Sequence, residues 1–174
     1  DRACLRRDRI YRYNWDARSG LFLDYNFQTG KRRHYEFATT FFPLWAGLAS
    51  PNQAARVAAN LPLFERPGGI VTSTFASGNQ WDLPFGWAPL QMVAVEGLRT
   101  YGHQVEANRV SLAFLSLVLQ EFKTSGTIVE KYDVVKRTSR VSEGIRFGYD
   151  SNEIGFGWTN AVFSRLYDRL PAGQ

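Results

Sequence analysis

The chain has 174 residues, a net charge of +5 and one cysteine, Cys4, which excludes an intrachain disulfide. It contains no apolar run of about 18 residues or more, so no membrane-spanning segment is predicted. The aromatic share is 15%, with five Trp, eight Tyr and thirteen Phe, which favours a folded domain with aromatic pockets over a disordered tail.

The positive charge comes largely from two short basic clusters, at residues 6–12 and 31–33. Clusters of this size are typical of solvated faces, and no groove-reading motif accompanies them. We therefore predict neither a nucleic-acid partner nor a membrane partner. The chain starts in a charged segment without an initiator Met, so we expect a processed or truncated sequence. The compartment of this soluble protein, periplasmic or cytoplasmic, stays open.

The first part of the chain alternates helices and turns. Residues 3–17 predict a helix ended by Ser19-Gly20, and residues 21–27 alternate as a short strand does. Residues 36–49 predict an apolar helix in which Pro43 would introduce a kink.

Helices dominate the remainder. Ser50 and Gln53 form a predicted capping box for a helix that runs to about Leu61. Further helices are expected over 88–101, 104–123 and 158–170, and irregular segments over 70–87 and 124–157. The helix over 104–123 is apolar around much of its circumference, which predicts burial on more than one side. Apolar helices without a strong strand pattern indicate an all-α architecture.

The densest group of chemically useful residues lies at 78–89, where two Trp, one Asp and two amides accompany Gly and Pro. Indole faces stack on sugar rings, and carboxylates and amides bind sugar hydroxyls, so the segment is suited to a sugar pocket. The alternative is a packed turn in which Trp81 and Trp87 anchor the core. Composition alone leaves both interpretations open.

Residues 80–89 resemble the second signature of the trehalase family, Q-W-D-x-P-x-G-W-A-P, at every fixed position. Residues 67–70 resemble the lead-in to that signature, and residues 129–133 and 155–160 are similar to two further trehalase motifs in the same order. The resemblance extends from about Tyr11 to Leu170.

The resemblance implies a fold and an activity. Trehalases form an α/α toroid of paired helices, with long irregular loops forming one mouth, and hydrolyse α,α-trehalose with inversion and without a metal. Residues 1–174 would then be the C-terminal part of one catalytic domain, present as a partial barrel.

The resemblance places the general base on Glu130. The general acid belongs to an S-G-W-D segment that this chain lacks, since Asp16 shares only the Trp-Asp pair. We therefore expect the acid in an N-terminal remainder or a companion chain, and the isolated chain to be inactive. Without the resemblance, the residues around Glu130 favour a surface residue paired with Lys131.

The expected substrate-binding residues are Gln80, Trp81, Asp82, Trp87, Glu143 and Glu153. Family members use one Glu between the last two motifs to contact the sugar, and Glu143 and Glu153 both remain candidates for it. His34 and His103 are distant in sequence and lack a Cys partner, so no metal or other cofactor is expected.

Three rival functions remain. The protein could be another α/α-toroid glycosidase acting on a different glucoside, because fold alone does not separate these activities. It could be a noncatalytic sugar-binding or assembly module. A nucleic-acid binder is the third.

Overall fold

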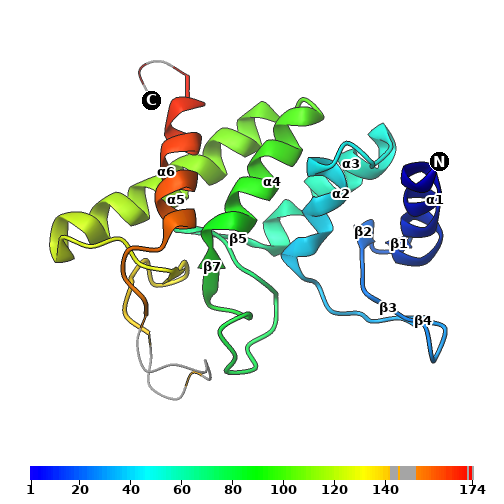
Figure 1. Cartoon of the computed structure of the whole chain (residues 1–174), viewed down its shortest axis with the longest axis horizontal. Helices are drawn as coiled ribbons and strands as arrows, with labels where there is room; N and C mark the ends of the chain where they lie inside the picture. The colour runs from blue at the N-terminus through cyan, green and yellow to red at the C-terminus, as the bar shows by residue number, and fades with distance from the viewer. Residues whose placement is uncertain (142–144, 146–151, 172, 174) are drawn as a thin grey trace.

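The structure is a computed structural model that describes residues 1–141, 145, 152–171 and 173. In Figure 1 the helices fill the upper part of the molecule, where α6 crosses α5, and the described segments 25–32, 71–84 and 126–141 lie below them. The α-helices are α1 (Arg2–Arg9), α2 (Phe42–Trp45), α3 (Pro51–Ala59), α4 (Ala88–Thr100), α5 (Gln104–Ser125) and α6 (Gly157–Asp168).

The strands are short and form antiparallel pairs. The pairs are β1 (Trp15–Asp16) with β2 (Leu21–Phe22), β3 (Tyr25–Asn26) with β4 (Lys31–Arg32), β5 (Glu65–Arg66) with β6 (Gly69–Ile70), and β7 (Phe85–Trp87) with β8 (Lys131–Asp133). The fold is thus helix-rich, and each short strand pair holds two loop segments together.

Helix α4 is the centre of the core and packs against α2, α5 and α6. It is buried on nearly all sides, and Gly97 permits the closest approach: a Cβ there would lie 2.9 Å from Leu44 Cβ and from Trp45 N. Because α4 begins directly after β7, its burial fixes the loop that carries the first sequence motif.

The predicted capping box is confirmed. Ser50 Oγ accepts from the Gln53 backbone N–H at 3.2 Å, and Gln53 Oε1 accepts from the Ser50 N–H at 2.8 Å. Pro51 occupies the first helical position, where its missing N–H is harmless. The helix ends at Ala59, slightly before the predicted end.

Two predicted helices are shorter than expected. After α1 the chain makes a π-helical turn (Ile10–Asn14), and Trp15–Asp16 then form strand β1, because Gly20 (φ 75°) turns the chain back onto β2. Residues 36–49 contain a 3₁₀ turn (Ala38–Phe41) followed by the four-residue α2. Pro43 lies in the first turn of α2, so it helps to start that helix instead of kinking a longer one.

Helices α4, α5 and α6 confirm the predictions over 88–101, 104–123 and 158–170. One face of α5 is buried, but its opposite face leaves Val105, Leu112, Leu119 and Phe122 exposed. The prediction that this helix is buried on more than one side is therefore wrong for the chain by itself.

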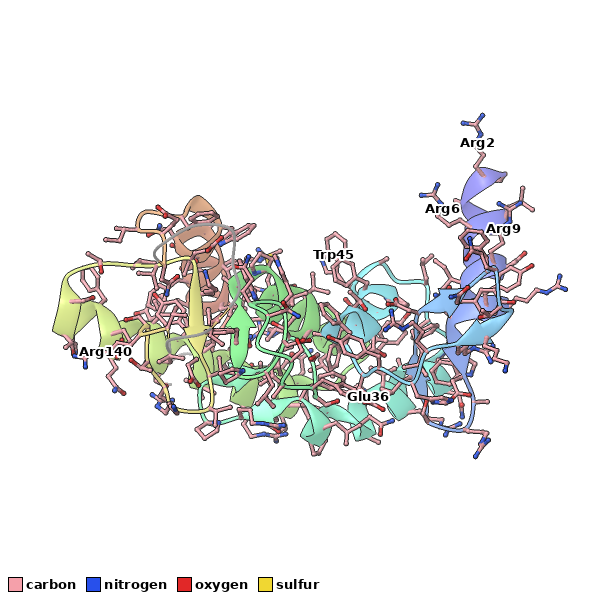
Figure 2. The ribbon with its side chains drawn as sticks, turned by 90° about the horizontal axis from the view of Figure 1, so that it is seen from below. Arg2, Arg6, Arg9, Glu36, Trp45 and Arg140 are labelled. Carbon is pink, nitrogen blue, oxygen red and sulfur yellow. The ribbon has the colours of Figure 1, made fainter. Side chains whose placement is uncertain are left out.

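The basic clusters lie largely at the surface. Arg2, Arg6 and Arg9 project from α1 into solvent (Figure 2). Within the described ranges, no helix is both long and apolar enough to cross a membrane.

Candidate active site

Strands β7 and β8 bring the first two sequence motifs together. Trp87 lies opposite Lys131, and Gly86 lies opposite Tyr132. Only a glycine fits at position 86, because a Cβ there would lie 2.5 Å from Val134 Cγ1 and 2.6 Å from Ile70 O. Strand β8 was missed within the segment 124–157, which the sequence predicted to be irregular.

The third motif joins the other two through backbone hydrogen bonds. The Glu130 N–H donates to Glu153 O at 2.9 Å, and the Gly155 N–H donates to Ile128 O at 3.0 Å. The Thr159 hydroxyl, in the first turns of α6, donates to Val129 O at 2.9 Å. Three motifs that are distant in sequence therefore meet at one place beside the N-terminus of α4.

Two tryptophans form a parallel stack at this place. The Trp81 and Trp87 rings lie 3.8 Å apart with an interplanar angle of 3°, and Trp158 packs edge-on against Trp87 at 5.7 Å. Trp81 is 43% exposed, whereas Trp87 is 1% exposed. Trp87 Nε1 donates to Gln80 O at 2.9 Å, which fixes the orientation of the inner ring. The stack thus presents one indole at the surface and supports it with a buried one.

Glu130 is buried, with 5% of its surface exposed. Its Oε2 lies 2.7 Å from Nζ of Lys131, which is completely buried, and that ammonium lies 5.3 Å from the ring centroid of Trp87. The pairing with Lys131 is present, but the surface location that accompanied it in the alternative interpretation is wrong. A buried ion pair beside an aromatic face holds the carboxylate in a fixed position.

Asp82 is 4% exposed and accepts hydrogen bonds from three hydroxyl groups. Ser73 Oγ donates to it at 2.7 Å, and the hydroxyls of Tyr35 and Ser77 also donate. Burial raises the pKa of Asp82, but the hydrogen bonds from Ser77, Tyr35 and Ser73 outweigh it and leave the pKa below its ordinary value. The ionised carboxylate therefore ties the loop before β7 to the segment that follows β4.

The three hydroxyl residues around Asp82 were not predicted. Ser73 and Ser77 lie within ten residues of Asp82, so their proximity in sequence was a signal that could have been used. Tyr35 is 47 residues away from Asp82, and nothing in the local sequence pattern indicates their contact.

Glu153 and Glu143 are the two predicted candidates for the acidic sugar contact. Glu153 is exposed, and its backbone pairs with Glu130. Glu143 lies outside the described residues. Among the residues with described positions, no group of three His, Cys, Asp or Glu side chains could hold a metal ion.

Residues 1–171 match the sequence model of the family described as Trehalase. The cytosolic neutral trehalase of Saccharomyces cerevisiae is 41% identical over 179 residues, which cover 92% of this chain and 24% of the relative. The periplasmic trehalase of Salmonella choleraesuis is 39% identical over 166 residues, covering 95% of this chain and 28% of the relative. The chain thus spans about a quarter of the length of these relatives.

Solved structures share the fold of this chain. Neutral trehalase Nth1 from Saccharomyces cerevisiae superposes with a TM-score of 0.81 at 38% identity, over 98% of this chain and 30% of that one. A GH63 mannosylglycerate hydrolase from Thermus thermophilus, in complex with glucose, superposes with a TM-score of 0.69 at 20% identity. It covers 90% of this chain and 37% of the hydrolase, a likeness of fold alone.

Proposed function

Since the chain belongs to the trehalase family, we propose that the full-length protein hydrolyses α,α-trehalose to two glucose molecules with inversion of configuration. The observation that carries the proposal is the meeting of three trehalase motifs around a half-exposed indole and a buried carboxylate. Residues 1–174 would form the C-terminal part of one α/α-toroid catalytic domain, with its loops at one mouth of the barrel. The loops lie on the same side of the helices, which supports their placement at one mouth of the barrel (Figure 1).

Glu130 is the proposed general base. Inversion requires a carboxylate that takes a proton from water on one face of the sugar, while an acid roughly 6.5–9.5 Å away protonates the leaving oxygen. The contact with Lys131 supports the role because it fixes the carboxylate. The acid would come from the N-terminal remainder of the protein or from a companion chain, so the isolated chain should not hydrolyse trehalose.

The proposed sugar-binding surface is the exposed face of Trp81, with Trp87 as the wall behind it. The contacts favour a positioning role for Gln80, through its carbonyl on Trp87, and for Asp82, through the hydrogen bonds that it accepts. Glu153, beside Glu130, and Glu143 remain the two candidates for the acidic sugar contact.

Activity of the full-length protein tests the assignment of Glu130. Glu130→Gln should lower kcat on trehalose by about 10²-fold to 10⁴-fold or more, because a positioned proton acceptor is lost. Glu65→Gln is the matched control, since that carboxylate pairs with Arg109 and lies outside the three motifs. Near-normal turnover by Glu130→Gln would reject it as the base.

A panel of other glucosides as substrates tests the proposed substrate. Trehalose should have the highest kcat/KM. Preference for another glucoside would favour the rival glycosidase, and binding without turnover would favour the noncatalytic module.

A further inference from the structure

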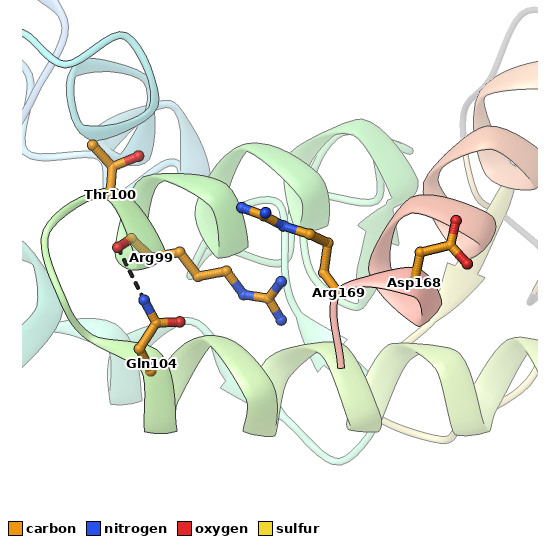
Figure 3. Close-up of a pocket in the computed structure, with 5 residues that line it drawn as sticks. All are labelled: Arg99, Thr100, Gln104, Asp168 and Arg169. Carbon is orange, nitrogen blue, oxygen red and sulfur yellow. Dashed lines mark hydrogen bonds between the residues drawn. The ribbon is translucent and has the colours of Figure 1, made fainter. Parts of the chain in front are cut away.

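A polar pocket lies at the opposite end of α4 from Trp87. It has a volume of about 460 Å³ and is lined by Arg99, Thr100, Gln104, Asp168 and Arg169, where α4 and α6 end and α5 begins (Figure 3). The 13 residues of α4 separate it from the tryptophan stack by roughly 20 Å at about 1.5 Å per residue. The proposed catalytic residues therefore do not account for this pocket.

Arg99 is the central residue of the pocket. It is 8% exposed, and its Nη2 donates to Asn108 Oδ1 at 3.0 Å. Within the described part of the chain, its Nε is buried and has no hydrogen-bond partner. A buried charged donor without an acceptor is costly, so an acceptor from outside these residues would be favourable.

The carboxylates near the pocket do not supply that acceptor. Glu96 Oε1 lies 3.3 Å from Arg165, and its Oε2 lies 3.3 Å from Arg169. Asp168 points away from the Arg99 guanidinium (Figure 3). Burial lowers the pKa of Arg99, Glu96 opposes this, and the positive charges of Arg169 and Arg165 lower it further. Glu96 thus faces three arginines, Arg99, Arg165 and Arg169.

The start of α5 adds to the positive character. His103, the residue before the helix, makes no side-chain cap, so the first backbone N–H groups of α5 have no capping side chain. Gln104 Nε2 donates to Arg99 O at 3.2 Å, which holds the helix start against Arg99. Glu106, in the first turn, partly offsets this positive end.

We propose that this pocket binds a small oxyanion of the phosphate class, held by the guanidinium groups of Arg99 and Arg169. Guanidinium groups form paired, charge-assisted hydrogen bonds with tetrahedral oxyanions, and the Arg99 Nε–H has no acceptor among the described residues. The bound anion would join the ends of α4, α5 and α6 and so stabilise the folded protein.

Thermal denaturation of the full-length protein in increasing inorganic phosphate, at constant ionic strength set with chloride, tests this. Phosphate should raise Tm in the wild-type protein. Arg99→Met should raise the half-saturating phosphate concentration by at least about tenfold, because a hydrogen bond to a charged group is lost. Arg18→Met, which removes an exposed arginine elsewhere, should respond as the wild type does.

Arg169→Met keeps the test valid if Arg99→Met does not fold, because the Arg169 side chain is 45% exposed. It should also weaken the response to phosphate. An unchanged response in both pocket variants would overturn the proposal. So would a wild-type protein whose Tm does not respond to phosphate. Turnover of trehalose is not needed for any of these readouts.

Discussion

Replacing Lys131 with Met tests whether the buried ion pair beside Trp87 holds the site together. Methionine keeps much of the length and apolar volume of the lysine stem but removes the ammonium. Lys131 Nζ lies 2.7 Å from Glu130 Oε2 and 5.3 Å from the Trp87 ring centroid, and the side chain is fully buried. The substitution therefore removes an ionic contact and a cation–π contact at once.

The expected cost follows from this burial. Removing one partner of a buried ion pair destabilises a protein by about 3–5 kcal/mol, because the charge that remains loses a partner that offset part of its desolvation. The additional substitution Glu130→Gln removes that charge, so the double variant should be destabilised by less than the sum of the two single variants. We expect a coupling free energy of about 1–3 kcal/mol between the two positions.

Urea denaturation of the full-length protein, followed by circular dichroism and Trp fluorescence, measures these free energies of unfolding. Arg109→Met is the matched control, since Arg109 pairs with Glu65 at 2.6 Å but its side chain is 50% exposed. Breaking that surface pair should cost at most about 1 kcal/mol. A Lys131→Met variant no less stable than Arg109→Met, or additive effects in the double variant, would refute the reasoning.

Three further predictions concern Trp81, Asp82 and Gly86, in the first motif. Trp81→Ala in the full-length protein should lower kcat/KM for trehalose by about tenfold, because stacking on the sugar is lost. Trp45→Ala removes an exposed indole on α2 and should leave kcat/KM unchanged. Equal effects of the two substitutions would contradict a sugar-binding role for Trp81. Asp82→Asn should cost about 2 kcal/mol near neutral pH. Because the folded pKa of Asp82 is lowered, its contribution is present above its unfolded pKa of about 3.9 and is lost as pH falls through the folded value. Urea denaturation at several pH values should therefore show the difference between wild type and variant shrinking below about pH 4, and a constant difference would argue against an ionised Asp82. Gly86→Ala should lower the free energy of unfolding by at least about 1–3 kcal/mol, because the added Cβ overpacks its surroundings. At Gly157 an added Cβ meets nothing within 4 Å, so Gly157→Ala should be neutral or stabilising. Similar Tm values for the two variants would contradict the packing argument.

The sequence by itself determined the local features of this protein. The capping box at Ser50 and Gln53 depends on groups three residues apart, and the structure contains it as predicted. Helices α4, α5 and α6 follow from long apolar patterns between turn residues. The motif at 80–89 pointed to trehalase because its information lies in residue identity and spacing, which need no tertiary structure.

Only the tertiary structure decided how exposed each member of a motif is. Trp81 and Trp87 look equivalent in the sequence, yet one is half-exposed and the other is buried against β8 and α6. Without the family resemblance, Glu130 and Lys131 looked like a surface pair, yet both are buried, and Lys131 lies opposite Trp87 of β7. Tyr35 reaches Asp82 across 47 residues. Each outcome depends on contacts between segments distant in the chain, and no local pattern encodes which segment will cover another.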